Sequence, residues 1–422
     1  MVMRSYNFPG VYVPNIRHAD LCVSVAELGS LTAAAERKNI SQPAASQAIA
    51  GLEVQFGGQI FERTNGKLSL TPRGEVVHLR FVRGLKLLAL CDEAFRSHRS
   101  GNGKEPANFL RCATSANLRA IVAVTLTGSF SAAAIALGRS EPAVNKSIHK
   151  LEALMGVQLF DRHPGGTVAT YLGRIVARLS GRALKEFCGA LDEVLELDGR
   201  FEGTIAIGAS PVARSRILPN AIMDLLRRHP RANFTVRDGS QSDLIWELQL
   251  GSVDIVVGAV EKTDLGAGLD YRVLFADQLS VVAGAMHPLS GKKDIEASEL
   301  LGFPWILPPK GTATREVMER AWLGAGMSMP AFGTIETDSM ELIRAVLMAS
   351  NCLTVLSEPH LSRETDPNWV RRLNFELAGG RRKIGLITRA GWRPTRLQGD
   401  FVKVLNDAVE WTFSEPEVAD GR

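Results

Sequence analysis

The sequence has no long apolar segment and no secretory pattern at its start. None of its apolar runs approaches the roughly 20 residues that a membrane-spanning helix needs. Met1 is followed by mixed residues, without the charged-then-apolar order of a signal peptide. These two absences predict a cytoplasmic protein with no membrane partner.

Cysteines are few and scattered. The chain has five, an odd number, and no two of them form a Cys-x-x-Cys pair, which argues against a disulfide framework and against a zinc site. We therefore expect reduced core cysteines. Cys352 is an alternative as a redox sensor or nucleophile, because it is the only thiol in the second half.

Motifs of catalysis are also missing. The sequence has no P-loop, no nucleophile motif, no glycine-rich dinucleotide fingerprint and no metal-ligand spacing. His287 precedes Pro288 and is expected to be a loop residue rather than a catalytic base. We expect no cofactor and no enzyme activity.

Charge is unevenly distributed along the chain. Residues 1–200 hold 24 lysines and arginines against 17 acidic residues, whereas the rest of the chain holds 25 against 28. Such an asymmetry is expected when only the first half meets a polyanion. It favours nucleic acid as a partner of the first half, although an excess of this size is a weak signal by itself.

The first half contains an internal repeat. Residues 29–35 (GSLTAAA) recur as 128–134 (GSFSAAA), an offset of 99. The same register continues without a gap from residues 61–63 against 160–162 to Gly74 against Gly173. A gapless match of this length does not arise by chance, so the first half carries two copies of one module.

Each copy has the pattern of three helices. In the first copy, Leu21, Val25 and Leu28 recur at helical spacing and predict a first helix with one buried stripe. A second helix is expected from a cap at Ser30 to Asn39. A short turn then leads to the third helix.

The third helix is predicted from Gln42 to about Gly57, with Ser41 as its cap and Pro43 in its first turn. The apolar residues on its buried face are Ala45, Ile49 and Leu52. The polar residues left exposed near its start are Ser46 and Gln47 in the first copy and Asn145 and Lys146 in the second. Two helices joined by a tight turn, with short polar side chains on the second, suit the major groove of DNA.

A short hairpin follows the third helix. Residues 64–67 (TNGK) are typical of a turn, and residues 68–71 (LSLT) alternate like a strand. This pattern predicts a wing, flanked by Arg63 and Thr71, whose side chains could hold phosphates. The alternative is an ordinary three-helix domain with a solvated polar face.

Several motifs of the first copy resemble the winged helix-turn-helix of LysR-type transcription regulators. They are Ser30-x-Thr32-x-Ala34-Ala35, Ser41-Gln42-Pro43-Ala44-x-Ser46, Leu52-Glu53, Phe61-x-Arg63 and Leu70-Thr71-x-x-Gly74. The resemblance implies that the third helix enters the groove of double-stranded DNA. It implies as candidate contacts Ser41, Gln42, Pro43, Ser46, Gln47 and Arg63.

The second copy keeps most of these motifs but departs at the start of its third helix. Glu141 stands at the position of Gln42, and a carboxylate repels phosphates. The candidate contacts of this copy are Ser140, Asn145, Lys146 and Arg162. We expect the first copy to read base sequence and the second to contribute dimerisation or phosphate contacts.

A long apolar-periodic stretch follows each wing. Its apolar positions are Val77, Phe81, Leu85 and Leu88 after the first wing, and Val176, Leu179, Ala183, Phe187, Ala190 and Val194 after the second. The spacing predicts helices that pair. In the LysR-type family such a helix pairs with another and supports a dimer, which implies a homodimer or homotetramer. Packing of each helix on its own domain and pairing within the chain are the alternatives.

From Gly203 onward, short apolar strands alternate with amphipathic helices, the pattern of a parallel sheet. Strands are expected at 204–208, 234–236 and 254–258, and helices at 217–228, 244–250 and 340–348. Ligands of such sheets bind beyond the carboxyl ends of the strands. This rule selects as contacts for an anionic or polyhydroxyl effector Ser210, Gly258, Thr312, Asp338 and Ser339. Each of them could instead cap a helix.

The second half also resembles the LysR-type effector domain. The motifs are Ile205-x-Ile207-Gly208, Leu218-Pro219, His229-Pro230, Leu248-x-x-Gly251-x-x-Asp254 and His287-Pro288-Leu289. The resemblance implies two Rossmann-like subdomains, related in fold to periplasmic binding proteins, that close on a small molecule. It places the crossings between them near residues 260–261 and 357–359.

The sequence therefore predicts a multidomain fold. Two winged helix-turn-helix modules with linker helices are expected at 17–97 and 113–198, separated by a flexible joint at 98–112, and an α/β effector domain at 201–414. The predicted function is a sequence-specific DNA-binding transcription regulator modulated by a small-molecule effector, with RNA polymerase as a further partner. The alternatives are a constitutive or architectural DNA-binding protein with an unresponsive cleft and, less favoured, an enzyme that uses the cleft.

Overall fold

The computed structural model describes residues 13–98, 108–260, 268–324, 326, 328–330, 333–357, 360 and 369–414. The chain forms two compact units that divide between Gly203 and Thr204, and segments 249–252 and 395–397 are grouped with the first unit. Most of the predicted flexible joint lies outside the described residues, and the two units are taken separately below.

The first unit begins with one winged helix-turn-helix module, called head 1. Its helices are α1 (Ile16–Leu28), α2 (Leu31–Lys38) and α3 (Gln42–Gln55), and its wing is the hairpin of β1 (Phe61–Thr64) with β2 (Lys67–Leu70). The predicted caps are confirmed: the hydroxyls of Ser30 and Ser41 accept the backbone N–H groups of residues 33 and 44. Asn39 ends α2 in the left-handed conformation, with φ 53°. The buried stripe of α1 was predicted one residue too long, because Leu28 is 42% exposed.

The second copy, called head 2, repeats this arrangement. Its helices are α6 (Ser115–Thr127), α7 (Phe130–Leu137) and α8 (Glu141–Met155), and β3 (Phe160–His163) with β4 (Gly166–Ala169) forms its wing. The short helix α5 (Phe109–Cys112) precedes it. The repeat found in the sequence is therefore a repeat of tertiary structure.

Two repeated residues hold each wing against its third helix. The carboxylate of Glu53 accepts the backbone N–H of Ile60 at 3.0 Å, and the carboxylate of Glu152 accepts that of Leu159 at 2.7 Å. Glycine recurs after each wing because a Cβ at Gly74 or Gly173 would overlap a backbone carbonyl oxygen. These contacts explain why Leu-Glu and glycine recur at the same offset.

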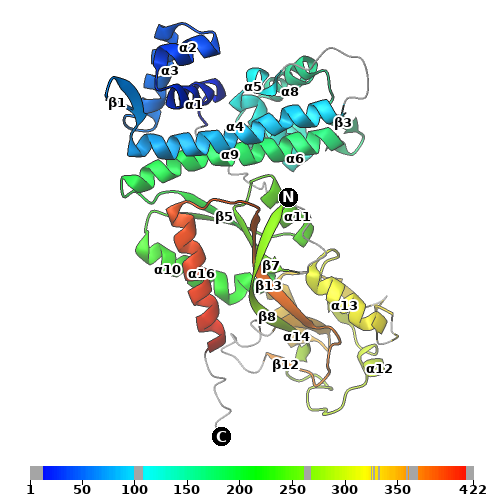
Figure 1. The fold of residues 1–422 in the computed structure, drawn as a ribbon. Helices are drawn as coiled ribbons and strands as arrows, with labels where there is room; N and C mark the ends of the chain where they lie inside the picture. The colour runs from blue at the N-terminus through cyan, green and yellow to red at the C-terminus, as the bar shows by residue number, and fades with distance from the viewer. Residues whose placement is uncertain are drawn as a thin grey trace. The chain divides into compact units, whose positions relative to one another are not determined.

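The long helices after the wings, α4 (Pro72–His98) and α9 (Tyr171–Leu197), lie side by side in Figure 1. Their apolar stripes are buried as predicted. Arg73 pairs with Asp198 and Arg83 with Glu186, so the two helices run antiparallel. Pairing within the chain, one of the arrangements that the sequence left open, is observed, and each helix also packs against its own head. Because each head precedes its helix, heads 1 and 2 sit at opposite ends of the pair.

The α4–α9 interface combines ring packing with buried charge. Phe81 and Phe187 meet edge to face with centroids 5.8 Å apart, and a side chain at Gly84 would collide with the Phe187 ring. Arg80, whose side chain is 5% exposed, donates to Glu186 at 2.8 Å and to Glu193 at 2.7 Å. A buried guanidinium needs such partners, because its desolvation is otherwise uncompensated.

The second unit is built on a mixed sheet in the order β10-β9-β11-β8-β13-β7-β5-β6. One half is parallel: β5 (Thr204–Ala209) lies between β6 (Asn233–Arg237) and β7 (Ile255–Ala259). In the other half, β9 (Trp305–Leu307) pairs in parallel with β10 (Thr334–Glu336) and β11 (Leu353–Ser357). The predicted strands are confirmed, and antiparallel β8 (Leu269–Gly284) and β13 (Arg381–Arg389) join the two halves.

The predicted crossings between the halves are wrong. Strand β8 pairs with β13 up to residue 278 and with β11 from residue 279, so the first crossing lies inside β8. Strand β12 (Val370–Arg372) still pairs with the far end of β8, in the second half of the sheet. The chain therefore returns to the first half after β12 and before β13. Val260 remains in the first half because its N–H donates to the carbonyl of Lys383. Residues 261, 358 and 359 lie outside the described part of the chain.

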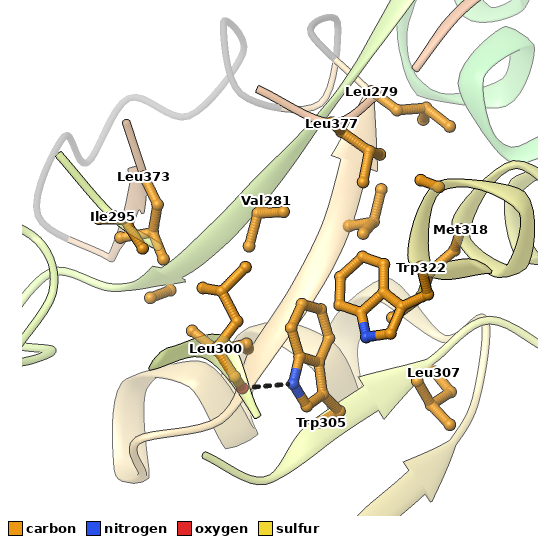
Figure 2. Close-up of a cluster of buried hydrophobic side chains, with 14 of the residues drawn as sticks. Leu279, Val281, Ile295, Leu300, Trp305, Leu307, Met318, Trp322, Leu373 and Leu377 are labelled. Atoms are coloured by element: carbon orange, nitrogen blue, oxygen red, sulfur yellow. Dashed lines mark hydrogen bonds between the residues drawn. The ribbon is translucent and has the colours of Figure 1, made fainter. Parts of the chain in front are cut away.

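Helices cover the sheet of this second unit. The predicted helix at 217–228 is preceded by a π-helical turn, η1 (Ala213–Ile217), and continues as α10 (Leu218–Arg228). The others include α11 (Gln241–Gln249), α12 (Ala297–Leu300), α13 (Ala313–Gly324), α14 (Met340–Ala349) and α16 (Arg396–Ser414). In Figure 2, Trp305 and Trp322 pack at 4.8 Å between centroids, and the Trp305 indole donates to the Leu300 carbonyl at 3.0 Å.

The cysteines are free thiols in the structure. Cys22, Cys91 and Cys352 are buried, and burial raises the pKa of the Cys22 thiol to about 12. Cys352 is 5% exposed, as expected of a core residue. Among the residues described, no helix combines the length and apolarity needed to cross a membrane.

Candidate functional site

The third helix of head 1 presents an uncharged polar face. Gln42, Ser46 and Gln47 are exposed, while the apolar side of α3 is buried against α1 and α2. The Ser41 hydroxyl caps the helix, and Pro43 is exposed in its first turn. Glutamine can bind adenine through two hydrogen bonds, and serine can donate to either kind of base edge. The face is thus chemically suited to base reading.

The two candidate phosphate contacts at the wing of head 1, Arg63 and Thr71, differ in whether their side chains are free to bind DNA. Arg63 on β1 is exposed. The Thr71 hydroxyl donates to the Gln59 carbonyl at 2.7 Å and accepts the N–H of Gly74 at 3.0 Å. Thr71 therefore acts as a cap at the start of α4, and Arg63 is the residue of this pair that is available to DNA.

Head 2 has a different surface at the same positions. Ser140 is the N-cap residue of α8, but its side chain makes no capping hydrogen bond. Lys146 is exposed. The Asn145 amide oxygen accepts a hydrogen bond from Arg162 at 3.1 Å, and the Arg162 guanidinium lies 5.4 Å from the ring centroid of Phe130. Two of the predicted contacts thus bind each other.

A further lysine of head 2 was missed by the sequence analysis. Lys150 is exposed one turn after Lys146 on α8, whereas α3 of head 1 contains no lysine or arginine. The helical spacing of the two lysines was visible in the sequence. The third helix of head 1 therefore offers hydrogen-bonding groups, whereas that of head 2 offers positive charge.

The second unit contains a cavity of about 80 Å³ at the carboxyl ends of β5, β9 and β10. Three predicted effector contacts, Ser210, Thr312 and Asp338, line it. Its apolar wall includes Leu244 and Ile343. A mostly apolar wall with a few polar groups is typical of small-molecule sites.

The other two predicted contacts lie elsewhere. Gly258 is buried beneath Gln241, whose side-chain oxygen would be 2.8 Å from a Cβ there. The Ser339 hydroxyl accepts the N–H of Leu342 and caps α14. Neither is among the described residues that line the cavity. Both were selected by the strand-end rule, which locates a loop but does not orient its side chains.

Thr312 lines the cavity but its hydroxyl is occupied. It donates to the Pro309 carbonyl at 2.7 Å and accepts the N–H of Arg315 at 3.3 Å. The Thr312 hydroxyl therefore caps a helix, which is the alternative that the sequence left open.

Three buried polar atoms of the cavity lack partners. Among the described residues, nothing hydrogen-bonds to the Ser210 hydroxyl, to Nε of Arg214 or to Nδ1 of His360. Nη1 of Arg214 lies 3.5 Å from the exposed carboxylate of Asp238. An unsatisfied buried polar atom is costly, so these atoms are suited to a ligand that supplies the missing bonds.

A buried network borders the same cavity. Arg382 donates to Asp277 at 2.8 Å, to the Ser357 hydroxyl at 3.0 Å and to the Thr314 hydroxyl at 2.9 Å. It connects β8, β11, β13 and α13. Sequence reasoning missed Arg382, Arg214 and His360, because the partners of Arg382 lie 25 to 105 residues away and no local pattern marks them.

Burial lowers the pKa of His360 below its ordinary value. Asp277 and the Pro211 backbone oppose this shift, and the positive charges of Arg382 and Arg214 add to it. His360 is therefore neutral near pH 7. Within the described residues, no cluster of His, Cys, Asp or Glu is arranged to hold a metal ion.

A duplicated winged helix-turn-helix joined to an α/β unit with a cavity at its strand ends defines the class of ligand-responsive bacterial transcription regulators. The chain matches the description "Bacterial regulatory helix-turn-helix protein, lysR family" over residues 16–75 and again over 115–174. It matches "LysR substrate binding domain" over residues 198–410. The chain belongs to the LysR family and carries that family's DNA-binding module twice.

Individual relatives differ in how much of the chain they cover. The HTH-type transcriptional regulator GalR of Pseudomonas putida is 30% identical over 381 residues, 90% of this chain and 94% of the relative. PcaQ of Agrobacterium fabrum is 26% identical and covers 70% of this chain and 95% of itself. The alignment with GalR is too long to omit either head.

A solved structure shares the fold. A full-length OxyR variant from Pseudomonas aeruginosa has a TM-score of 0.52 at 22% identity, covering 71% of this chain and 95% of that chain. Sequence and fold together establish a DNA-binding transcription regulator whose second half binds a small-molecule effector.

The low pKa of His360 predicts acid sensitivity of the second unit. Because the unfolded chain binds a proton near pH 6.5 more readily than the folded chain does, the free energy of unfolding falls as pH drops below about 6.5. His287, whose pKa is also lowered by burial, adds to this slope. In denaturant titrations followed by tryptophan fluorescence between pH 7.5 and 5.5, His360→Gln and His287→Gln should each flatten the slope. An unchanged slope in His360→Gln would show that its titration is not coupled to folding.

Proposed function

We propose that the two heads divide the work of DNA binding. Head 1 reads base sequence through Gln42, Ser46 and Gln47, with Arg63 on a phosphate. Head 2 binds the backbone through Lys146. The single observation that carries this proposal is the contrast between an α3 without lysine or arginine and a lysine-bearing α8 at equivalent positions of the repeat.

The remaining candidate contacts take supporting parts in this proposal. Ser41 and Pro43 set the start of α3, and Thr71 sets the start of α4. In head 2, Arg162 holds Asn145 and can reach a phosphate from the wing, while Ser140 begins α8. Glu141 argues against base reading by this head, because its carboxylate would face the phosphates.

We further propose that the effector is a small carboxylic acid with an apolar body. The apolar wall of the cavity would cover the body, and Ser210 and Arg214 would donate hydrogen bonds to the carboxylate. Charge-assisted bonds of this kind are among the stronger ones in proteins. A polyhydroxyl ligand fits less well, because most of the surface that lines the cavity is apolar.

The other parts of the proposal concern location and assembly. A regulator that acts on DNA would work in the cytoplasm, and we assign it no catalytic reaction. If it forms homodimers or homotetramers, the contacts between chains would lie outside the α4–α9 interface, which is already filled within one chain. RNA polymerase is the expected partner at a promoter.

Matched double variants test the division of work between the heads. Replacing Ser46 and Gln47 by Ala should remove base-edge bonds, each good contact being worth roughly 1–3 kcal/mol of discrimination, so specific binding falls towards the nonspecific level. Replacing Asn145 and Lys146 by Ala should weaken binding to all sequences and reduce the salt slope by about one unit. Affinity for a selected operator and for random duplex, measured across salt, separates the two outcomes. Loss of specificity in the head 2 variant alone would reverse the assignment.

Acids and their uncharged amides test the effector proposal. Acetate, butyrate or benzoate should raise the thermal midpoint of the second unit, because a ligand of the folded state stabilises it, whereas acetamide, butyramide and benzamide should not. Ser210→Ala should weaken acid binding about ten-fold or more, as expected for a bond to a charged group. Ser350→Ala, on the exposed end of α14, is the matched control. Equal responses to acids and amides would rule out carboxylate recognition.

A further inference from the structure

The contacts between α4 and α9 are asymmetric although the helices belong to repeated copies. Arg80 lies between Glu186 and Glu193. At the offset of 99 residues, Arg80 corresponds to Leu179, and the two glutamates correspond to Leu87 and Ala94. One end of the interface is therefore charged and the repeat-related end is apolar.

This asymmetry distinguishes α4–α9 pairs from pairs of like helices. Two α4 helices packed in the same antiparallel register would place each Arg80 against Leu87 and Ala94, without a carboxylate. Two α9 helices would place Glu193 against Leu179, although Arg182, the repeat equivalent of Arg83, would still face Glu186. Each like pair would thus bury at least one charge, Arg80 or Glu193, without its partner, which is unfavourable. The charges thus select the unlike pair and disfavour the others.

The geometry of the chain favours the same choice. Both helices belong to one chain, so their association has a high effective concentration and needs no second molecule. Arg73 with Asp198 adds an ion pair near one end of the interface. The interface thus holds head 1 at one end and head 2 at the other.

We propose that each chain binds duplex DNA as a fixed pair of unlike heads, so that its site consists of two different neighbouring half-sites in one order. The proposal rests on the division of work between the heads proposed above. Head 1, with the uncharged polar face of α3, would require a defined base sequence. Head 2, with Lys146 and Lys150 on α8, would accept many sequences in the adjoining half-site.

Tethered DNA cleavage by the full chain tests this order. Glu62→Cys and Asp161→Cys, equivalent positions on the two wings, would each carry an iron chelate, with the unsubstituted chain as control for the native thiols. The DNA is an operator selected with the full chain from a random duplex pool. We expect the Glu62 probe to cut one half-site of a neighbouring pair and the Asp161 probe to cut the other.

The outcomes separate this inference from the function on which it rests. If each probe cuts both half-sites of a pair, like heads are paired and the inference is overturned. If the Asp161 probe cuts nowhere, head 2 does not meet DNA and the division of work itself fails. A selected pair with two identical halves would also contradict the inference.

Charge exchange tests the selection of the unlike pair. Arg80→Glu should lower affinity for the two-half-site duplex by about 10²–10⁴-fold, the range expected when two linked sites lose their joint geometry. Affinity for a duplex with only the head 1 half-site should change little. Adding Glu193→Arg to Arg80→Glu re-forms one ion pair and leaves Glu186 with Arg83, so it should restore part of the loss. Failure of this rescue, with helical circular dichroism unchanged in both variants, would show that the charges do not select the pair.

Discussion

The buried contact of Arg80 with Glu186 and Glu193 is the constraint on which the first unit depends. A guanidinium at 5% exposure is tolerated only when carboxylates replace the water that it has lost. Removal of one partner from such a contact typically costs about 3–5 kcal/mol, because the remaining charge stays buried. The register of α4 against α9 is therefore strongly specified. Since each head is attached at the start of its own helix, that register also sets where the two heads lie.

In the second unit, a bonded network of buried polar groups lies close to buried polar atoms that have no hydrogen-bond partner in the described part of the chain. The Arg382 network satisfies its donors and ties four elements of the sheet and its helices together. A few residues away, the Ser210 hydroxyl and Nδ1 of His360 are buried without partners in the described structure. A hydrogen-bonded border beside unsatisfied atoms is suited to a preorganised binding site. This contrast supports the proposed effector site more sharply than the strand-end rule does.

Much of this architecture was predictable, and the failures have physical reasons. Local signals such as the Ser30 and Ser41 caps and the buried stripes of α4 and α9 act within a few residues, and they were predicted correctly. Which helix pairs with which was left open, because both stripes are equally apolar and the deciding charges are about a hundred residues apart. The crossing inside β8 was missed for a similar reason, since one continuous strand serves two halves of the sheet. Arg382 and His360 carry no local pattern, so the sequence predicted the lining of the cavity only in part.

The central claim is that α4 pairs with α9 of the same chain, and cysteine cross-linking tests it most directly. Arg83→Cys with Glu186→Cys would be prepared in a chain whose half-exposed Cys112 and Cys188 are serine, and treated with a short bismaleimide. The account predicts a linked species of monomer mass from the double variant, because the two side chains are in contact at 2.9 Å. It predicts no covalent dimer from Arg83→Cys alone. Covalent dimers from that single variant would show that α4 pairs with α4 of another chain and would contradict the account.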